Sequence, residues 1–171
     1  MVENVWLLFL PQLPSSPSSL RVLVWRRLRA AGALGLQHGV WVLPHTPEQE
    51  RVFHALLGGG GLLSAASPLD AALPADIVGR FRAERAEDYT EFGSRCRDFL
   101  AEIAKETAGG NFGFTELEEN EQDLQKLVGW LAKIRARDFF PGEPAEEAAR
   151  ALATCERALA RFTSAVYAAA G

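Results

Sequence analysis

The pattern of hydrophobic residues changes near Leu73-Pro74, and this change constrains the fold more than any other feature. Before this point short β-type runs alternate with helical patterns, and after it the whole chain reads as helical. A chain of 171 residues suffices for one compact domain or for a small domain with a helical extension. We therefore expect a mixed domain over residues 1–73 and a helical extension over 74–171, packed on it or beside it.

The first region contains strand and helix candidates in the order β-α-β-β-α-β. Helix starts are marked by a capping residue followed by proline, at Ser16-Pro17 and at Thr46-Pro47. His38-Gly39 is a tight hairpin signal, and the glycines of 58–61 indicate a turn. The expected strands are 5–10, 33–37, 40–44 and 62–66, and the expected helices are 17–31 and 47–57. This order predicts an α+β protein with a ferredoxin-like antiparallel sheet.

The second region predicts three helices with short connections, which should pack as antiparallel neighbours. The first runs from Pro74 to about Thr107, with a long amphipathic stripe. The second begins with a capping box, in which Thr115 is the N-cap and Glu118 lies at the third helical position. The third begins at Pro144 and is rich in alanine.

The first helix of the chain is basic, although the chain carries a formal charge of -4. At about 100° per residue, Arg26 and Arg29 fall opposite its apolar side and Arg21 lies at the boundary. These three arginines are candidates for contacts with DNA phosphates. Arg27 falls inside the apolar sector, with Leu23 among its neighbours. Since an unpaired guanidinium is costly to bury, Arg27 should reach a carboxylate, carbonyl groups or an anion.

Further arginines lie on the helical extension. Arg85 precedes Asp88 by three residues, and Arg135 precedes Asp138 by three, so both are candidates for pairs along one helix. If Arg85, Arg135 and the nearby Arg137 converged on Arg27, their guanidinium groups would form an oxyanion pocket. An internal ion pair and an oxyanion site therefore remain alternative readings of this set.

Signatures of catalysis and of metal binding are missing from the sequence. None of the three histidines lies in a catalytic motif, and no phosphate loop, cofactor motif or metal-ligand spacing occurs. We therefore expect no enzymatic activity, no cofactor and no metal site. Cys96 and Cys155 are expected to be small buried hydrophobes rather than a disulfide or redox pair. The apolar run 5–10 is too short to span a bilayer, so a cytoplasmic protein without a membrane segment is expected.

Several segments together resemble the N-terminal domain of the chromate-resistance ChrB family. They are V-W-R-R-L-x-x-x-G-A at 24–33, V-W-V-L-P at 40–44, and the stretches 80–89, 114–127 and 134–140. The resemblance covers nearly the whole chain and implies a regulator linked to chromate-resistance genes. In that family the full-length protein is a chromate-responsive, DNA-binding transcription factor. The chain ends at Gly171, where the family's second domain would begin, so we expect an excised domain or a protein whose partner is encoded separately.

Two hypotheses on function follow. The first is a transcription-regulatory module that binds promoter DNA or a partner through the basic helix. The second is a protein-interaction or oxyanion-sensing domain that makes no DNA contact. Expected partners are promoter DNA, a ChrB-type C-terminal domain on a separate chain, and a second copy paired through the edge of the fourth strand.

Overall fold

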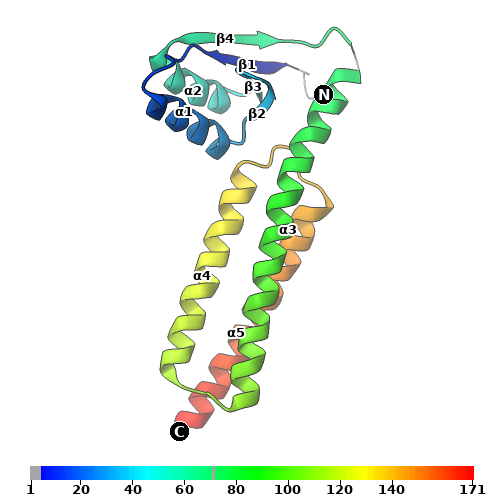
Figure 1. Ribbon diagram of the computed structural model, residues 1–171. Helices are drawn as coiled ribbons and strands as arrows, with labels where there is room; N and C mark the ends of the chain where they lie inside the picture. Colours follow the sequence, from blue (N-terminus) through cyan, green and yellow to red (C-terminus); the bar gives the residue numbers. More distant parts are fainter. Residues whose placement is uncertain (1–4, 71) are drawn as a thin grey trace. The chain divides into compact units, whose positions relative to one another are not determined.

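The computed structural model describes residues 5–70 and 72–171 (Figure 1). The chain forms two compact units, Met1–Phe81 and Arg82–Gly171, here called the sheet unit and the helical unit. Over the described residues it has four strands and five α-helices, which confirms the predicted α+β class. Helix α3 (Ala72–Gly109) begins in the sheet unit and continues through the helical unit.

The sheet unit contains one antiparallel sheet with the strand order β2-β3-β1-β4. Its strands are β1 (Trp6–Pro11), β2 (Leu34–Gln37), β3 (Val40–Pro44) and β4 (Gly61–Ala66). Its other helical elements are α1 (Ser18–Ala30), α2 (Pro47–Leu56) and a single 3-10 turn, η1 (Leu57–Gly59). All four predicted strands are confirmed, with ends shifted by at most one residue, as is usual where elements fray.

Aromatic stacking covers both faces of the central strand β1. Phe9 stacks on Phe53 of α2, with ring centroids 5.2 Å apart. Trp6 points to the opposite face, because side chains alternate along a strand, and stacks on Phe81 of α3 at 6.0 Å. The first turns of α3 also hold the edge strand β2, since Arg80 donates a 2.6 Å hydrogen bond to the Gly35 carbonyl.

Helix starts agree with the sequence only in part. Thr46 caps α2 as predicted, because its hydroxyl oxygen accepts a hydrogen bond from the Gln49 N–H. The predicted cap at Ser16 is wrong, since Pro17 is the N-cap and α1 begins at Ser18. The capping box at Thr115 is wrong as well. Helix α4 starts two residues earlier than that box requires, and its N-cap is a glycine without a side-chain hydrogen bond.

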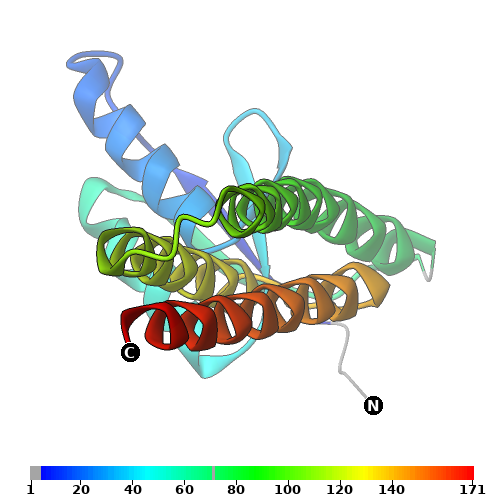
Figure 2. The same cartoon turned by 90° about the horizontal axis from the view of Figure 1, so that it is seen from below.

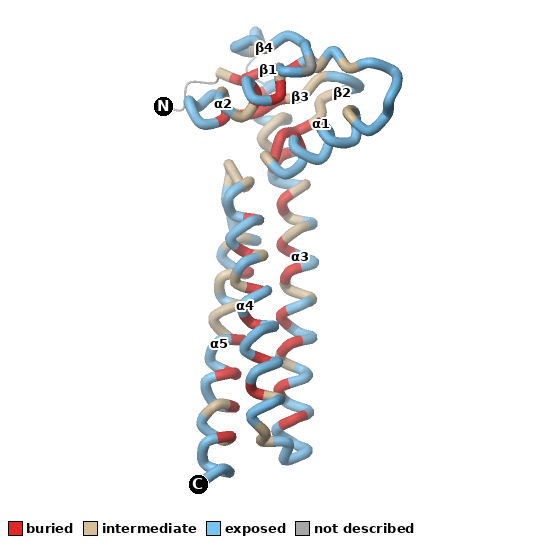
Figure 3. Tube along the Cα trace, turned by 90° about the vertical axis from the view of Figure 1, so that its left-hand side faces the viewer, coloured by how far each residue is buried: buried red, intermediate tan, exposed pale blue. Residues whose placement is uncertain are grey.

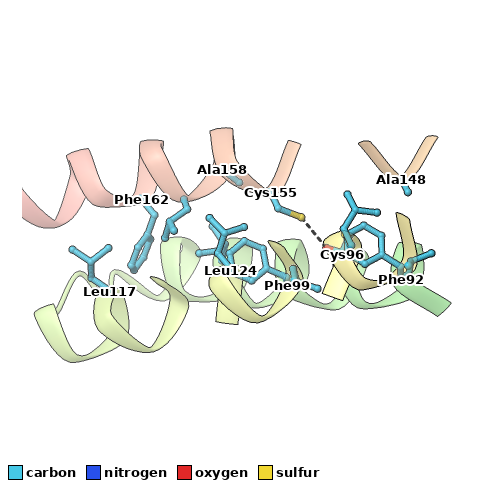
Figure 4. Close-up of a cluster of buried hydrophobic side chains, with 14 of the residues drawn as sticks. Phe92, Cys96, Phe99, Leu117, Leu124, Ala148, Cys155, Ala158 and Phe162 are labelled. Atoms are coloured by element: carbon cyan, nitrogen blue, oxygen red, sulfur yellow. Dashed lines mark hydrogen bonds between the residues drawn. The ribbon is translucent and has the colours of Figure 1, made fainter. Parts of the chain in front are cut away.

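The helical unit packs α3, α4 (Phe114–Ala136) and α5 (Glu143–Ala170) side by side around one apolar core (Figures 1 and 2). Figure 3 shows buried residues recurring along the inner faces of all three helices. The core includes Phe92 and Phe99 from α3, Leu124 from α4 and Phe162 from α5 (Figure 4). Among the described residues, no helix combines the length and apolarity that crossing a membrane requires.

Candidate functional site

Helix α1 exposes all four of its arginines. Arg21, Arg26 and Arg29 are exposed as the helical wheel predicts, but Arg27 is exposed too, so its predicted burial is wrong. The buried residues of α1 are Val24 and Leu28, which form a stripe only one residue wide. Leu23 is 45% exposed, and Arg27, one turn further on, shares its side of the helix. The helical-wheel prediction treated Leu23 as a buried residue. The predicted apolar sector was therefore too wide, and it included Arg27.

The exposed side of α1 combines positive charge with apolar surface. Trp25 is 53% exposed, Val22 is 43% exposed, and the helix has no acidic residue. Tryptophan and arginine are the side chains most enriched at binding hot spots, and arginine is also the main contact to nucleic-acid phosphates. The composition of this surface therefore suits a partner that is anionic, or one that presents both negative charge and apolar surface.

In the helical unit, two of the predicted arginines meet at one carboxylate. Arg85 Nε lies 3.2 Å from Asp88 Oδ2, and Arg137 Nη2 lies 3.1 Å from the same oxygen. The Arg85 side chain is only 8% exposed, whereas those of Asp88 and Arg137 are each 25% exposed. The pairing of Arg85 with Asp88 across three residues is as predicted, and Arg137 adds a contact from the end of α4.

A buried tyrosine adjoins this cluster. The Tyr89 hydroxyl donates a 2.7 Å hydrogen bond to Asp138 Oδ2, and the Phe140 N–H donates to Asp138 Oδ1. Burial raises the pKa of the Tyr89 hydroxyl above its ordinary value, and the hydrogen bond to Asp138 raises it further. The hydroxyl is therefore held protonated as a donor. Asp138 accepts hydrogen bonds from these two groups, and among the described residues no ion pair joins it to Arg135, its predicted partner.

A small cavity of about 60 Å³ lies against this network. Arg82 and Arg85 line it with guanidinium groups and Asp138 lines it with a carboxylate, while the Tyr89 hydroxyl is already donated to Asp138. Arg82 is exposed and directs its Nε at the Phe140 carbonyl at 3.4 Å. The cavity therefore has donors suited to a small anion, but it also contains a negative charge that opposes one.

Sequence reasoning found the arginines of this cluster but missed two of its connections. It did not foresee that Arg137 would reach Asp88, or that Tyr89 would donate to Asp138, 49 residues later. Both connections join α3 to the segment after α4, and no local spacing in the sequence signals a contact of that range.

Comparison with known proteins gives two matches. The family model described as "Protein ChrB, N-terminal" matches residues 21–171, which is most of the chain. Protein ChrB of Cupriavidus metallidurans is 28% identical over 152 residues, covering 85% of this chain and 44% of that protein. The chain thus spans less than half the length of this curated relative.

Proposed function

The chain belongs to the family of the N-terminal region of protein ChrB, and from this membership we propose that it is a chromate-resistance-associated regulatory module. The module acts by binding, without enzymatic activity, and works in the cytoplasm. It binds promoter DNA, or a regulator that is bound to that DNA, through the basic side of α1. The observation that carries the proposal is the family match together with the exposure of Arg21 and Arg26.

The electrostatics of α1 favour DNA as the first partner to test. The net charge of -4 would oppose binding to DNA over most of the surface, so contacts must be local. Arg21, Arg26 and Arg29 lie on a single helix of the sheet unit and have no acidic neighbour within that helix. Arginines placed in this way neutralise phosphates and release counterions, which makes binding strongly dependent on salt.

The experiment measures fluorescence anisotropy of a labelled duplex from a chromate-resistance promoter, with a scrambled duplex for comparison. We expect the R21A/R26A variant to bind at least tenfold more weakly and to lower the salt slope by about 2. The matched control is R95A/R157A, which removes the same charge from exposed positions of the helical unit. Absence of binding to any duplex at low salt would contradict DNA contact by this chain.

The second candidate function is oxyanion sensing without DNA contact, and the cavity beside Arg82, Arg85 and Tyr89 favours it. Calorimetric titration with chromate, sulfate and phosphate tests it. Arg82→Ala should abolish the heat of binding, because Arg82 lines the cavity but is exposed and not needed for the core. Arg95→Ala should leave it unchanged. A wild-type chain that gives no heat with any of the three anions would remove this candidate.

The proposal includes a finer description of the fold. We propose that residues 6–66 form a ferredoxin-like domain and that α3, α4 and α5 form an antiparallel three-helix extension of it. The strand order β2-β3-β1-β4 and the chain order β-α-β-β-α-β support the first part. Partners proposed from the family are a ChrB-type C-terminal domain on a separate chain and a second copy of this chain.

A further inference from the structure

The two cysteines of the chain meet in the core of the helical unit. Cys96 on α3 is 1% exposed and Cys155 on α5 is 0% exposed. The Cys155 thiol points at the Cys96 backbone carbonyl, with the sulfur 3.6 Å from the oxygen (Figure 4). These residues are 59 positions apart in the sequence, so the fold alone brings them together.

Each thiol affects the pKa of the other, because the two side chains are neighbours. Burial raises the pKa of Cys155 to about 12, and the adjacent Cys96 thiol adds to the rise. The pKa of Cys96 is raised as well, again mainly by burial. Both sulfurs are therefore protonated at neutral pH, which makes their oxidation slow. The two side chains nevertheless remain close together.

A groove of about 530 Å³ between α3 and α5 is lined in part by Cys96. Cys96 lines it together with the small residues Gly93, Ala148 and Ala151. Arg97 also lines the groove, and Tyr89 lines both the groove and the cavity of the ionic cluster. Cys155 does not line the groove, so the groove is the route by which a small oxidant would reach Cys96 first.

From this arrangement we propose that Cys96 and Cys155 form a site of reversible disulfide formation that links α3 to α5 under hydrogen peroxide. The Cys96 thiol first loses its proton, because only the thiolate is nucleophilic. The thiolate attacks one oxygen of hydrogen peroxide, the O–O bond breaks, and the leaving hydroxide takes up the Cys96 proton to form water. Cys96 is then a sulfenic acid. The Cys155 sulfur attacks the Cys96 sulfur, the S–O bond breaks, and the hydroxide leaves as a second water with the Cys155 proton. Two thiols are oxidised by two electrons, and one peroxide is reduced to two waters.

The test treats the purified full chain with hydrogen peroxide and, separately, with diamide, whose N=N bond is reduced to a hydrazine by two thiols. We expect an intact mass lower by two hydrogens, a peptide pair joined through Cys96 and Cys155, and reversal by dithiothreitol. Cys96→Ser and Cys155→Ala should each give no intramolecular link, with circular dichroism as the check on folding. Two free thiols in treated wild type, separate sulfinic acids, or links only between chains would each overturn the proposal.

A second variant tests the route of entry without altering either thiol. Ala151→Phe fills the groove and should slow disulfide formation by fivefold or more. Ala160→Phe, at an exposed position of the same helix that does not line the groove, is the matched control and should react at the wild-type rate. Equal rates for both variants and wild type would overturn the assigned entry route.

Discussion

Tyr89 on α3 and Asp138 after the end of α4 are joined by a 2.7 Å hydrogen bond that ties together two distant segments of the helical unit. The phenol is buried, and Asp138 uses its other oxygen to accept from a backbone N–H. This bond fixes the turn between α4 and α5 against α3, next to the carboxylate that Arg85 and Arg137 share. The position of that turn determines the shape of the small cavity described above.

Removing the Tyr89 hydroxyl should destabilise the protein while leaving the fold intact. Tyr89→Phe keeps the ring in the core but deletes the donor to Asp138, so we expect a loss of about 1–2 kcal/mol in the free energy of unfolding. Urea denaturation followed by circular dichroism measures it. Tyr167→Phe is the control, because that ring is 62% exposed and its change should stay within about 0.5 kcal/mol. Equal losses in the two variants would contradict the assigned role of the hydrogen bond.

Two substitutions on α1 should separate binding from stability. Trp25→Ala removes a side chain that is 53% exposed and should lower the free energy of unfolding by about 1 kcal/mol or less. Leu28→Ala empties a buried position, 1% exposed, and should cost about 2–5 kcal/mol. If α1 is the binding surface, Trp25→Ala should still weaken DNA or partner binding in the anisotropy assay. Unchanged binding together with unchanged stability would show that Trp25 lies outside the interface.

Gly61 should be intolerant of any side chain. Its φ of +141° is unfavourable for other residues, and an added Cβ would lie 2.5 Å from the Leu10 carbonyl oxygen. We expect Gly61→Ala to destabilise by about 1–3 kcal/mol, since β4 must move away from β1. Gly58→Ala is the matched control, because nothing lies within 4 Å of its added Cβ. Thermal melts of both variants measure the difference, and a melt of Gly61→Ala equal to that of Gly58→Ala would refute the steric argument.

The buried thiol of Cys155 should make stability depend on alkaline pH. Its pKa rises from 9.0, the ordinary value for a solvated cysteine thiol, to about 12 in the folded chain. The folded state therefore keeps a proton that the unfolded state loses, and this contribution is fully present below pH 9 and is lost as pH rises toward 12. The slope from one proton is at most about 1.4 kcal/mol per pH unit. We expect the urea midpoint, measured under reducing conditions between these pH limits, to fall less steeply with pH for Cys155→Ala than for wild type. Parallel pH dependences of the two midpoints would contradict the prediction.

Local patterns in the sequence predicted the elements well. Runs such as 40–44, the hairpin at His38-Gly39 and the Thr46 cap each depend on a few neighbouring residues, and the structure has them where expected. The predictions of a cap at Ser16 and of a capping box at Thr115 were wrong, since α1 begins at Ser18 and α4 begins at Phe114. Which start is used depends on how the preceding segment packs, and propensity alone does not determine that.

The candidate site was less predictable, because its contacts are long-range. A helical wheel assigns a side chain to an angle, but the width of the buried stripe depends on what packs against the helix. On α1 that stripe is narrow, so Leu23 and Arg27 are both exposed. The pairing of Cys96 with Cys155 and of Tyr89 with Asp138 likewise requires the packed bundle. Spacing in the sequence identified residues of the site, but their pairing depends on tertiary packing.

The position of β4 at the edge of the sheet has a consequence for how this protein behaves at high concentration. The strand G-L-L-S-A-A has no charge and no proline, and Leu62 on it is 59% exposed. Natural sheets protect their edges from aggregation with lysine, proline or bulges, and the opposite edge strand, β2, has such an irregularity between Gly35 and Gln37. Because β4 has no gatekeeper residue, we expect misassembly into extended β-structure to start at this strand. Leu62→Lys is therefore the substitution of choice for keeping concentrated samples monodisperse.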